Sequence, residues 1–488
     1  MMSRHGTIAC ALLLGGCSAV GPDYEGAPAS TAEVSAEFEV AAQPDSTVSS
    51  ATPAGAWWQL LNDSELDGLI EQATAANYDL RVAVANVEAA RAGLALVSTR
   101  QVPLINARGA VREARNATAV LPIANADDRA PTTTRGVFSL DLSWEIDLFG
   151  RVRRSIEAAD ADLAAQSALR DQVLVAVLAQ VVSSYIDLRG AQVRMAVAER
   201  NVAVQTQTLD LVAVLSAEGA ATELDVARAR TQLLTSQATI PSLRAAAAAA
   251  LNRLTTLTGR APGQLSDLLQ SPRGLPQLPS LVAIGKPADL LRRRPDILAA
   301  ERSLAAASAR IGVATADLFP TVTLDGLVGV AGAPLSNLTA AGAPTFELGP
   351  TVTWNVFDRE ASYARIRQSD SIAAAALVRY QATVTQALEE LDTAVRSWGQ
   401  ERARQTQLKA AQVESARASE LARLRYQEGV EDFLSVLDAE RNLLLIEDQL
   451  SLSEINLAQE LVNIHRALGG GWDTTQAPAY QAYRADPR

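Results

Sequence analysis

The chain has 488 residues, of which 48% are hydrophobic but only 4% aromatic, and its formal net charge is −12. This acidic balance excludes nucleic acid as the main partner, because binding to phosphate backbones requires a basic field. Low aromatic content with abundant alanine favours long helices over a compact aromatic core.

The N-terminus predicts a lipoprotein signal. A short charged region is followed by an apolar stretch from Ile8 to Leu14, and Leu14-Gly15-Gly16-Cys17 resembles a bacterial lipobox. The apolar stretch is too short to span a bilayer, which requires about 20 residues. We therefore expect a signal peptide over residues 1–16, a lipid on Cys17 and a lipidated extension over residues 17–63. An ordinary secretory signal is the alternative.

The chain repeats itself at an offset close to 210 residues. Trp144 and Trp354 are 210 positions apart, and so are Gly219 and Gly429. A constant offset between unlike landmarks indicates two copies of one structural plan. Each copy is expected to contain a helix, two strands, a very long helix, a turn and another helix. The predicted ranges are 64–100, ~103–115, ~136–148, 151–217 and 222–258 in repeat 1 (64–258), and 288–318, ~320–331, ~346–357, 359–427 and 432–468 in repeat 2 (288–468).

The two long segments are predicted to be continuous helices. Neither contains proline, and each contains one glycine, Gly190 in the first and Gly399 in the second. At 1.5 Å per residue, each helix would be about 100 Å long. Apolar residues recur in a 4-3-4-3 pattern, which favours supercoiling against neighbouring helices. This pattern alone leaves a simple rod or dimeric coiled coil open.

The strands alternate strictly between apolar and polar residues. Between Phe138 and Leu148 every second residue is large and apolar, and the same holds for most of Phe346 to Val356. Alternation over about ten residues is typical of a transmembrane β-strand, although a half-buried soluble sheet alternates equally well. Four strands cannot close a barrel, because the smallest such barrels use about eight. Three copies would supply twelve strands.

An ordered set of motifs identifies a family resemblance. The landmarks are Gly21-Pro22-Asp23-Tyr24, Trp57-Trp58, Ser143 to Arg151, Leu291-Arg292-Arg293-Arg294-Pro295-Asp296-Ile297 and Phe319-Pro320. With these landmarks the chain resembles the outer-membrane factor family of TolC-like proteins, and most closely its lipoprotein branch, which serves resistance-nodulation-division efflux pumps.

The resemblance implies an α+β membrane protein that forms a homotrimer. Its twelve-stranded β-barrel, with four strands per chain, would be continuous with a long α-helical periplasmic barrel. An equatorial collar would include the linker 259–287 and the C-terminal tail 469–488. Such a duct lies in the bacterial outer membrane and its lipid, extends into the periplasm, and works with a periplasmic adaptor and an inner-membrane pump.

The resemblance also assigns functional residues. It implies adaptor docking at two periplasmic tips, and a gate just beyond the second tip, where Leu434 would form a hydrophobic ring and Asp438 a carboxylate ring. The alternative is that Asp438 and Arg441 form an ordinary surface pair. The polar side of the strands would line the pore. Its carboxylates would give the pore a mild preference for cations, and Arg108 and Arg112 on the same side would reduce that preference. The assigned residues are Gly219, Thr222, Asp225, Gly429 and Asp432 at the tips, Arg441 and Arg228 as cations of the gate, and Asp141, Glu145, Asp147, Asp325 and Glu347 in the pore.

Enzyme functions have little support in the sequence. The only histidines are His5 and His465, so no histidine-based metal cluster is expected, and no cofactor motif occurs in a supporting context. Two other functions stay open: a duct for type I protein secretion, and a structural coiled-coil lipoprotein or adhesin.

Overall fold

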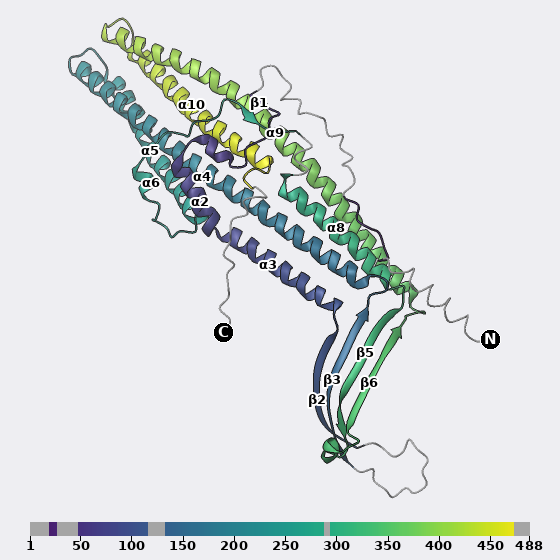
Figure 1. The fold of residues 1–488 in the computed structure, drawn as a ribbon. Helices are drawn as coiled ribbons and strands as arrows, with labels where there is room; N and C mark the ends of the chain where they lie inside the picture. The colour runs from purple at the N-terminus through teal and green to yellow at the C-terminus, as the bar shows by residue number, and fades with distance from the viewer. Residues whose placement is uncertain (1–18, 27–46, 116–131, 287–292, 473–488) are drawn as a thin grey trace. The chain divides into compact units, whose positions relative to one another are not determined.

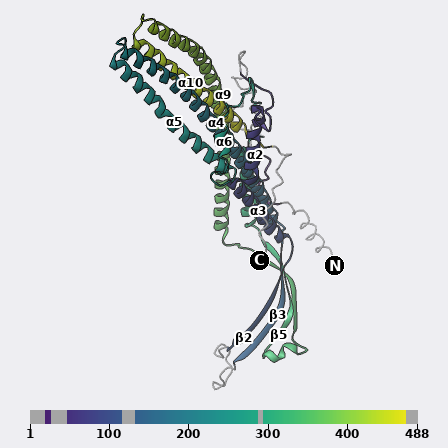
Figure 2. The same ribbon diagram turned by 90° about the vertical axis from the view of Figure 1, so that its left-hand side faces the viewer.

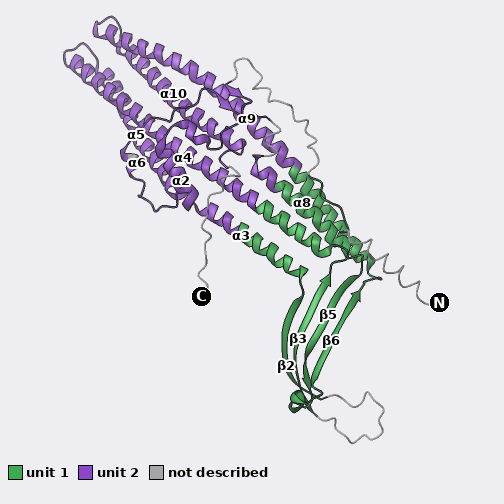
Figure 3. Cartoon of the chain, viewed as in Figure 1, with its two compact units in different colours: residues 1–29, 87–166, 300–380 green, residues 30–86, 167–299, 381–488 purple. Residues whose placement is uncertain are grey.

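A computed structural model of the chain describes residues 19–26, 47–115, 132–286 and 293–472. The expected signal peptide, Cys17 and residues 473–488 of the expected tail lie outside these ranges. The chain divides into two compact units (Figure 3). The first unit comprises residues 1–29, 87–166 and 300–380, and the second comprises residues 30–86, 167–299 and 381–488.

The first unit contains a four-stranded antiparallel sheet (Figure 1). Its strands are β2 (Leu104–Ala114), β3 (Thr133–Ile146), β5 (Thr321–Gly332) and β6 (Pro344–Thr353), in the order β2-β3-β5-β6. A short helix η4 (Leu335–Thr339) lies between β5 and β6. The edge strands of this sheet are β2 and β6, so its two edges are separated by the full width of the four strands.

The register aligns the alternating pattern of all four strands. Leu140 lies opposite Val328, which lies opposite Phe346, whereas Ser143 lies opposite Asp325. Directly opposed residues project from the same face of a sheet, so one face is apolar across its whole width. Many of its side chains are exposed: Ile105 63%, Val111 55%, Phe138 48%, Leu140 50%, Val328 57%, Phe346 85%, Leu348 68% and Val352 63%.

Equivalent tryptophans lie next to the helix–strand junctions of this unit. Trp144 donates a hydrogen bond from Nε1 to the carbonyl of Gln101, at 3.1 Å, and Trp354 donates one to the carbonyl of Leu318, also at 3.1 Å. Trp354 lies beyond the end of β6, because the chain turns there through a Val356 N–H to Trp354 carbonyl bond. The strand predicted to reach residue 357 therefore ends earlier.

The second unit is built on four long helices that run side by side (Figures 1 and 2). They are α4 (Arg151–Ala217), α5 (Glu223–Leu257), α9 (Arg359–Gln427) and α10 (Phe433–Ala467), but residues 151–166 of α4 and 359–380 of α9 belong to the first unit. By length and hydropathy α4 could cross a membrane, but 72% of its most apolar window is buried inside the protein, as in a core helix. The largest fully buried side chains of the described chain include Trp57, Trp398, Arg189 and Tyr185.

The predicted helix over residues 64–100 is wrong as a single element. It is divided into α2 (Ser64–Ala76) and α3 (Tyr78–Ser98), followed by the short helix η2 (Thr99–Gln101). Asn77 interrupts it: its Oδ1 accepts from the Leu80 N–H at 3.1 Å, and its Nδ2 donates to the Leu257 carbonyl at 3.0 Å. An asparagine that caps a new helix start while binding another element favours this break.

The joint between the predicted repeats carries short elements of its own. Helix α6 (Asp267–Gln270) is followed by β4 (Val282–Ala283), which pairs in parallel with β1 (Val48–Ser49). A 3-10 helix, η1 (Trp57–Leu61), lies between β1 and α2.

The triple-arginine motif has a structural role at its third residue. Helix α8 (Pro295–Ala316) begins at Pro295, and proline is favoured at a first helical position, whereas the predicted helix start at residue 288 lies outside the described residues. Arg294 is buried, binds the Asp296 and Glu390 carboxylates at 2.6 and 2.9 Å, and donates to the Ala467 carbonyl at 2.9 Å. The guanidinium of Arg294 therefore binds groups within the protein and stabilises the fold.

Candidate functional site: the hairpin tips and one face of α10

The first tip joins α4 to α5. Gly219, at φ +80°, adopts a left-handed conformation that favours glycine, and the Ala220 N–H closes the turn on the Leu215 carbonyl at 2.8 Å. Thr222 then caps α5: Asp225 N–H donates to Thr222 Oγ1 at 3.2 Å, and the Asp225 carboxylate accepts from the Thr222 N–H at 3.2 Å. This reciprocal capping box satisfies two backbone N–H groups at the start of α5.

The second tip joins α9 to α10 in the same way. Gly429 has φ +71°, and the Val430 N–H donates to the Arg425 carbonyl at 2.9 Å. Asp432 caps α10 by accepting from the Ser435 N–H at 3.1 Å. All five residues assigned to the tips are thus engaged in turning or capping, and such roles are compatible with a docking surface.

An apolar cluster holds the two hairpins together near their tips. Its buried members are Val212 of α4, Val226 and Ala229 of α5, and Phe433, Val436 and Leu437 of α10. Tyr426 of α9 packs against this cluster, with its ring centroid 5.6 Å from that of Phe433. Burial first, and then the Asp225 carboxylate, raise the pKa of Tyr426. This cluster therefore fixes which face of α10 remains free.

The free face of α10 carries the residues assigned to the gate. Leu434 is 43% exposed, Asp438 and Arg441 are exposed, and Leu445 is 56% exposed. Their spacing of four, three and four residues places them along one side of the helix, next to the side that faces the buried cluster. Two leucines that remain exposed beside a carboxylate and a guanidinium form a surface suited to contact with another molecule.

The cations near the gate bind partners other than Asp438. Arg441 donates from Nε to Gln232 Oε1 of α5 at 2.9 Å, and Arg228 lies 3.4 Å from the Asp225 carboxylate. Among the described residues Asp438 has no hydrogen-bond or ion-pair partner. The simple Asp438–Arg441 surface pair considered from the sequence is therefore not formed in this chain.

A buried charge next to the residues assigned to the gate was not singled out by sequence reasoning. Glu440 is 5% exposed, lies 2.7 Å from the Arg423 guanidinium and accepts from Thr208 Oγ1 at 2.9 Å. These contacts join α10 to α9 and to α4. The sequence did contain a sign of this burial: Glu440 follows Phe433, Val436 and Leu437 at helical spacing, so it falls on the same buried side of α10.

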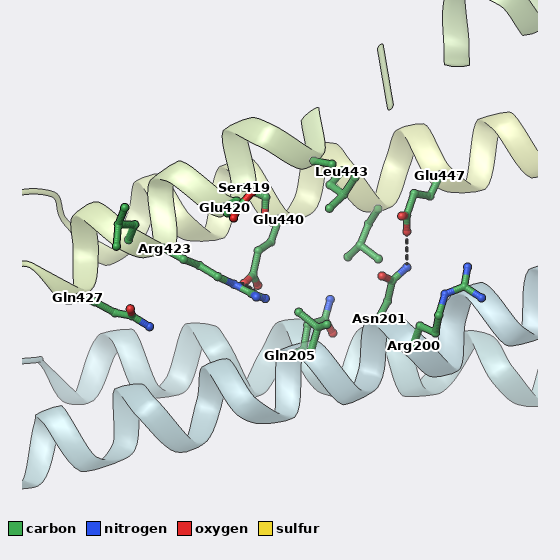
Figure 4. A pocket seen from close by; sticks show the side chains of 14 residues that line it. Arg200, Asn201, Gln205, Ser419, Glu420, Arg423, Gln427, Glu440, Leu443 and Glu447 are labelled. Carbon is green, nitrogen blue, oxygen red and sulfur yellow. Dashed lines mark hydrogen bonds and ion pairs between the residues drawn. The ribbon is translucent and has the colours of Figure 1, made fainter. Parts of the chain in front are cut away.

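A groove of about 530 Å³ lies beside Glu440 (Figure 4). Gln205 of α4 lines it; this side chain is 4% exposed, and its amide has no hydrogen-bond partner within the described chain. Asn201 spans the groove by donating to the Glu447 carboxylate at 3.1 Å. Contact between the two hairpins is thus polar and incompletely packed here, in contrast to the apolar cluster nearer the tips.

The residues assigned to the pore fall into two groups. Asp141, Asp325 and Glu347 lie on the polar face of the sheet, where Asp325 accepts from Ser143 Oγ at 3.0 Å. By contrast, Glu145 pairs with Arg151, and Asp147 accepts from the Val152 and Arg153 N–H groups at 3.0 Å, which caps α4. These last two carboxylates stabilise the strand–helix junction. No group of three potential metal ligands (His, Cys, Asp or Glu) occurs among the described residues.

Comparisons with known proteins agree over most of the chain. The family model described as outer membrane efflux protein matches residues 69–260 and 287–470. The chain is 31% identical to outer membrane protein OprJ of Pseudomonas aeruginosa, over 95% of both chains. It is 30% identical to the toluene efflux pump outer membrane protein TtgF of Pseudomonas putida, over 97% of this chain and 98% of that protein. It resembles the solved outer-membrane channel OprN with 38% identity and a TM-score of 0.86, over 93% of this chain and 99% of that one.

Proposed function

Because the chain belongs to the outer membrane efflux protein family, we propose that it is the outer-membrane exit duct of a tripartite efflux pump. It conducts small molecules such as drugs and toxic compounds passively, while an inner-membrane resistance-nodulation-division pump supplies the energy and a periplasmic adaptor joins the two. The exposed stripe Leu434–Asp438–Arg441–Leu445 is the observation that carries the gated-duct function, because its leucines and Asp438 stay exposed in a single chain and are free to meet other chains.

The duct is completed by trimerisation. Strands β2 and β6 are the edges of the four-stranded sheet, and unpaired edges invite pairing with another chain. Three copies supply twelve strands, which is within the range of transmembrane barrels. The apolar face with Phe346 at 85% and Leu348 at 68% exposure then meets lipid, and a lipid on Cys17 provides a further anchor.

The polar face of the sheet then lines the pore. Arg135 lies directly opposite Arg112 on this face, so the face carries three arginines, Arg108, Arg112 and Arg135. Since Glu145 and Asp147 are engaged by Arg151 and Arg153, the cation preference rests on the three carboxylates Asp141, Asp325 and Glu347 and is weaker than expected.

Removal of the Asp438 carboxylate tests the gate. In a closed trimer, three Asp438 carboxylates near one axis repel unless cations lie between them, so the closed state depends on bridges to Arg441 or Arg228 of neighbouring chains. We expect Asp438→Ala to lengthen the open time of single channels in planar bilayers. The matched control is Asp210→Ala, which removes another exposed carboxylate near the tips. Equal open times in Asp438→Ala and the parent chain would remove Asp438 from the gate.

Adjacent substitutions in β6 test the barrel. Leu348→Arg places a charge on the apolar face and is expected to cost about 2–4 kcal/mol near the bilayer midplane. Glu347→Arg changes charge on the opposite face and should fold into vesicles nearly as well as the parent chain. The comparison is made by urea titration after folding into phosphatidylcholine vesicles. In a soluble sheet, arginine at the 68% exposed position 348 would cost little, and such a result would contradict the transmembrane assignment.

A further inference from the structure

The segment that follows Cys17 lies on the helices of the first unit. The Val20 N–H donates to the Phe149 carbonyl at 3.0 Å, and Arg154 Nε donates to the Val20 carbonyl at 3.2 Å. Arg154 also binds the Asp23 carboxylate at 2.5 Å, and its side chain is only 4% exposed. Most N–H donors of this buried guanidinium thus bind one short peptide segment. Arg154 therefore acts as a clamp, that is, a side chain that holds the segment in place.

Two facing glycines allow this segment to approach α8 closely. Gly21, at φ +89°, lies directly on the backbone of Gly312, and a Cβ on Gly21 would overlap Gly312 Cα. A Cβ on Gly312 would lie only 2.8 Å from Arg154 Cγ and 2.9 Å from the Val20 carbonyl oxygen. No side chain fits at this crossing, so the segment has one position along α8.

The direction of the segment follows from its contacts. Tyr24 donates from its hydroxyl to Glu301 at 3.4 Å and packs against Leu304. Glu301 precedes Gly312 by about three helical turns, so the segment runs along α8 away from the strands. At the opposite end, Ala19 contacts Gly150, which lies between β3 and α4.

Ala19, two positions after Cys17, is the first residue that the structure describes, and it contacts Gly150 between β3 and α4. At this same junction Phe149 and Phe319 stack with ring centroids 4.7 Å apart. Aromatic residues of this kind gather where a membrane barrel meets water.

We propose that residues 19–24 form a strap, clamped by Arg154 and by the Gly21–Gly312 crossing, which sets where the lipid of Cys17 enters the membrane. Its first residue, Ala19, lies beside Gly150 where β3 joins α4, so the strap ties the depth of a lipid on Cys17 to the depth of the barrel. This proposal rests on the proposed lipidation of Cys17.

A spin label on the strap tests the proposal. The full chain carrying Pro22→Cys is labelled and reconstituted in vesicles of phosphatidylethanolamine and phosphatidylglycerol; Cys10 leaves with the signal, and Cys17 is blocked by its lipid. The label is expected to be immobilised in the parent chain. Gly21→Val should abolish the immobilised spectral component, because the new side chain overlaps Gly312.

The matched control is Gly26→Val. Gly26 also has a left-handed backbone, at φ +107°, but an added Cβ there meets no atom within 4 Å. The label should therefore stay immobilised in Gly26→Val. Arg154→Ala provides a second route and should also free the label; the heat-resistant oligomer reports whether each variant folds. A mobile label in the parent chain, or an immobilised one in both Gly21→Val and Arg154→Ala, would overturn the strap.

The strap and the lipid are separated by two further measurements. In Cys17→Ala, exported with a conventional cleavable signal, the label should remain immobilised, because protein contacts alone hold the strap. Mass spectrometry of the parent chain should find the lipid on Cys17. An unmodified Cys17 would overturn the lipid anchor while leaving the strap result intact.

Discussion

Replacement of Arg189 with leucine is expected to lower the free energy of unfolding of the second unit by about 3 kcal/mol or more. Arg189 is fully buried and contacts the Glu65 carboxylate of α2. The same guanidinium donates to Gln192 Oε1 at 2.8 Å and to the Ser271 carbonyl at 3.0 Å, and it lies 4.9 Å from the Tyr185 ring centroid. Its removal takes this donor from the Ser271 carbonyl of the joint, and it leaves the Glu65 carboxylate with only Arg273, 3.4 Å away, and the Tyr185 hydroxyl, 3.3 Å away.

The matched control for Arg189 lies on the same helix. Arg194 pairs with Asp448 at 2.9 Å, but its side chain is 28% exposed and that of Asp448 is 48% exposed. Solvent screening limits such pairs to about 0–1 kcal/mol, so Arg194→Leu should be nearly neutral. Both variants are compared by urea-induced unfolding in detergent, followed by tryptophan fluorescence. Equal midpoints for the two variants would show that the Arg189 network contributes no special stability.

Acidification is expected to destabilise the second unit through His465. This side chain is 1% exposed, stacks on Trp57 with ring centroids 4.7 Å apart, and neither of its ring nitrogens has a hydrogen-bond partner in the described chain. Burial lowers the pKa of His465 from 6.5 to about 4. Between these values the unfolded chain binds a proton that the folded chain does not. Stability is therefore lost as the pH falls from 6.5 to 4, by about 3 kcal/mol per chain in total.

His465→Phe isolates this effect from the titration of carboxylates. The phenyl ring can keep the stack on Trp57 but cannot be protonated, and it removes two buried nitrogens that lack partners. We expect the variant to be at least as stable as the parent chain at pH 7, and the parent chain to lose more stability than the variant between pH 7 and pH 5. Parallel losses in the two chains, measured as urea midpoints, would show that His465 does not titrate between the two states.

Several features of this protein follow from local sequence alone. The long helices α4 and α9 end two residues before Gly219 and Gly429, because a left-handed turn is least costly at glycine. Strict alternation between Phe138 and Ile146 produces one apolar and one polar face, since the period of a strand is two residues. The ordered motifs also identified the family, which the match over residues 69–260 and 287–470 confirms.

Tertiary structure decided what each charged residue does. Sequence reasoning treated Glu145 and Asp147 as pore carboxylates, but arginines and helix N–H groups at the following turn engage both. It left open an ordinary surface pair between Asp438 and Arg441 as the alternative to a gate, whereas Arg441 donates to Gln232, more than 200 residues away. The partner of a charged side chain depends on which helix packs beside it. That helix can be far away in the sequence, so a local sequence pattern does not reveal it. For the same reason, only the fold revealed the clamp of Arg154 on the segment after Cys17.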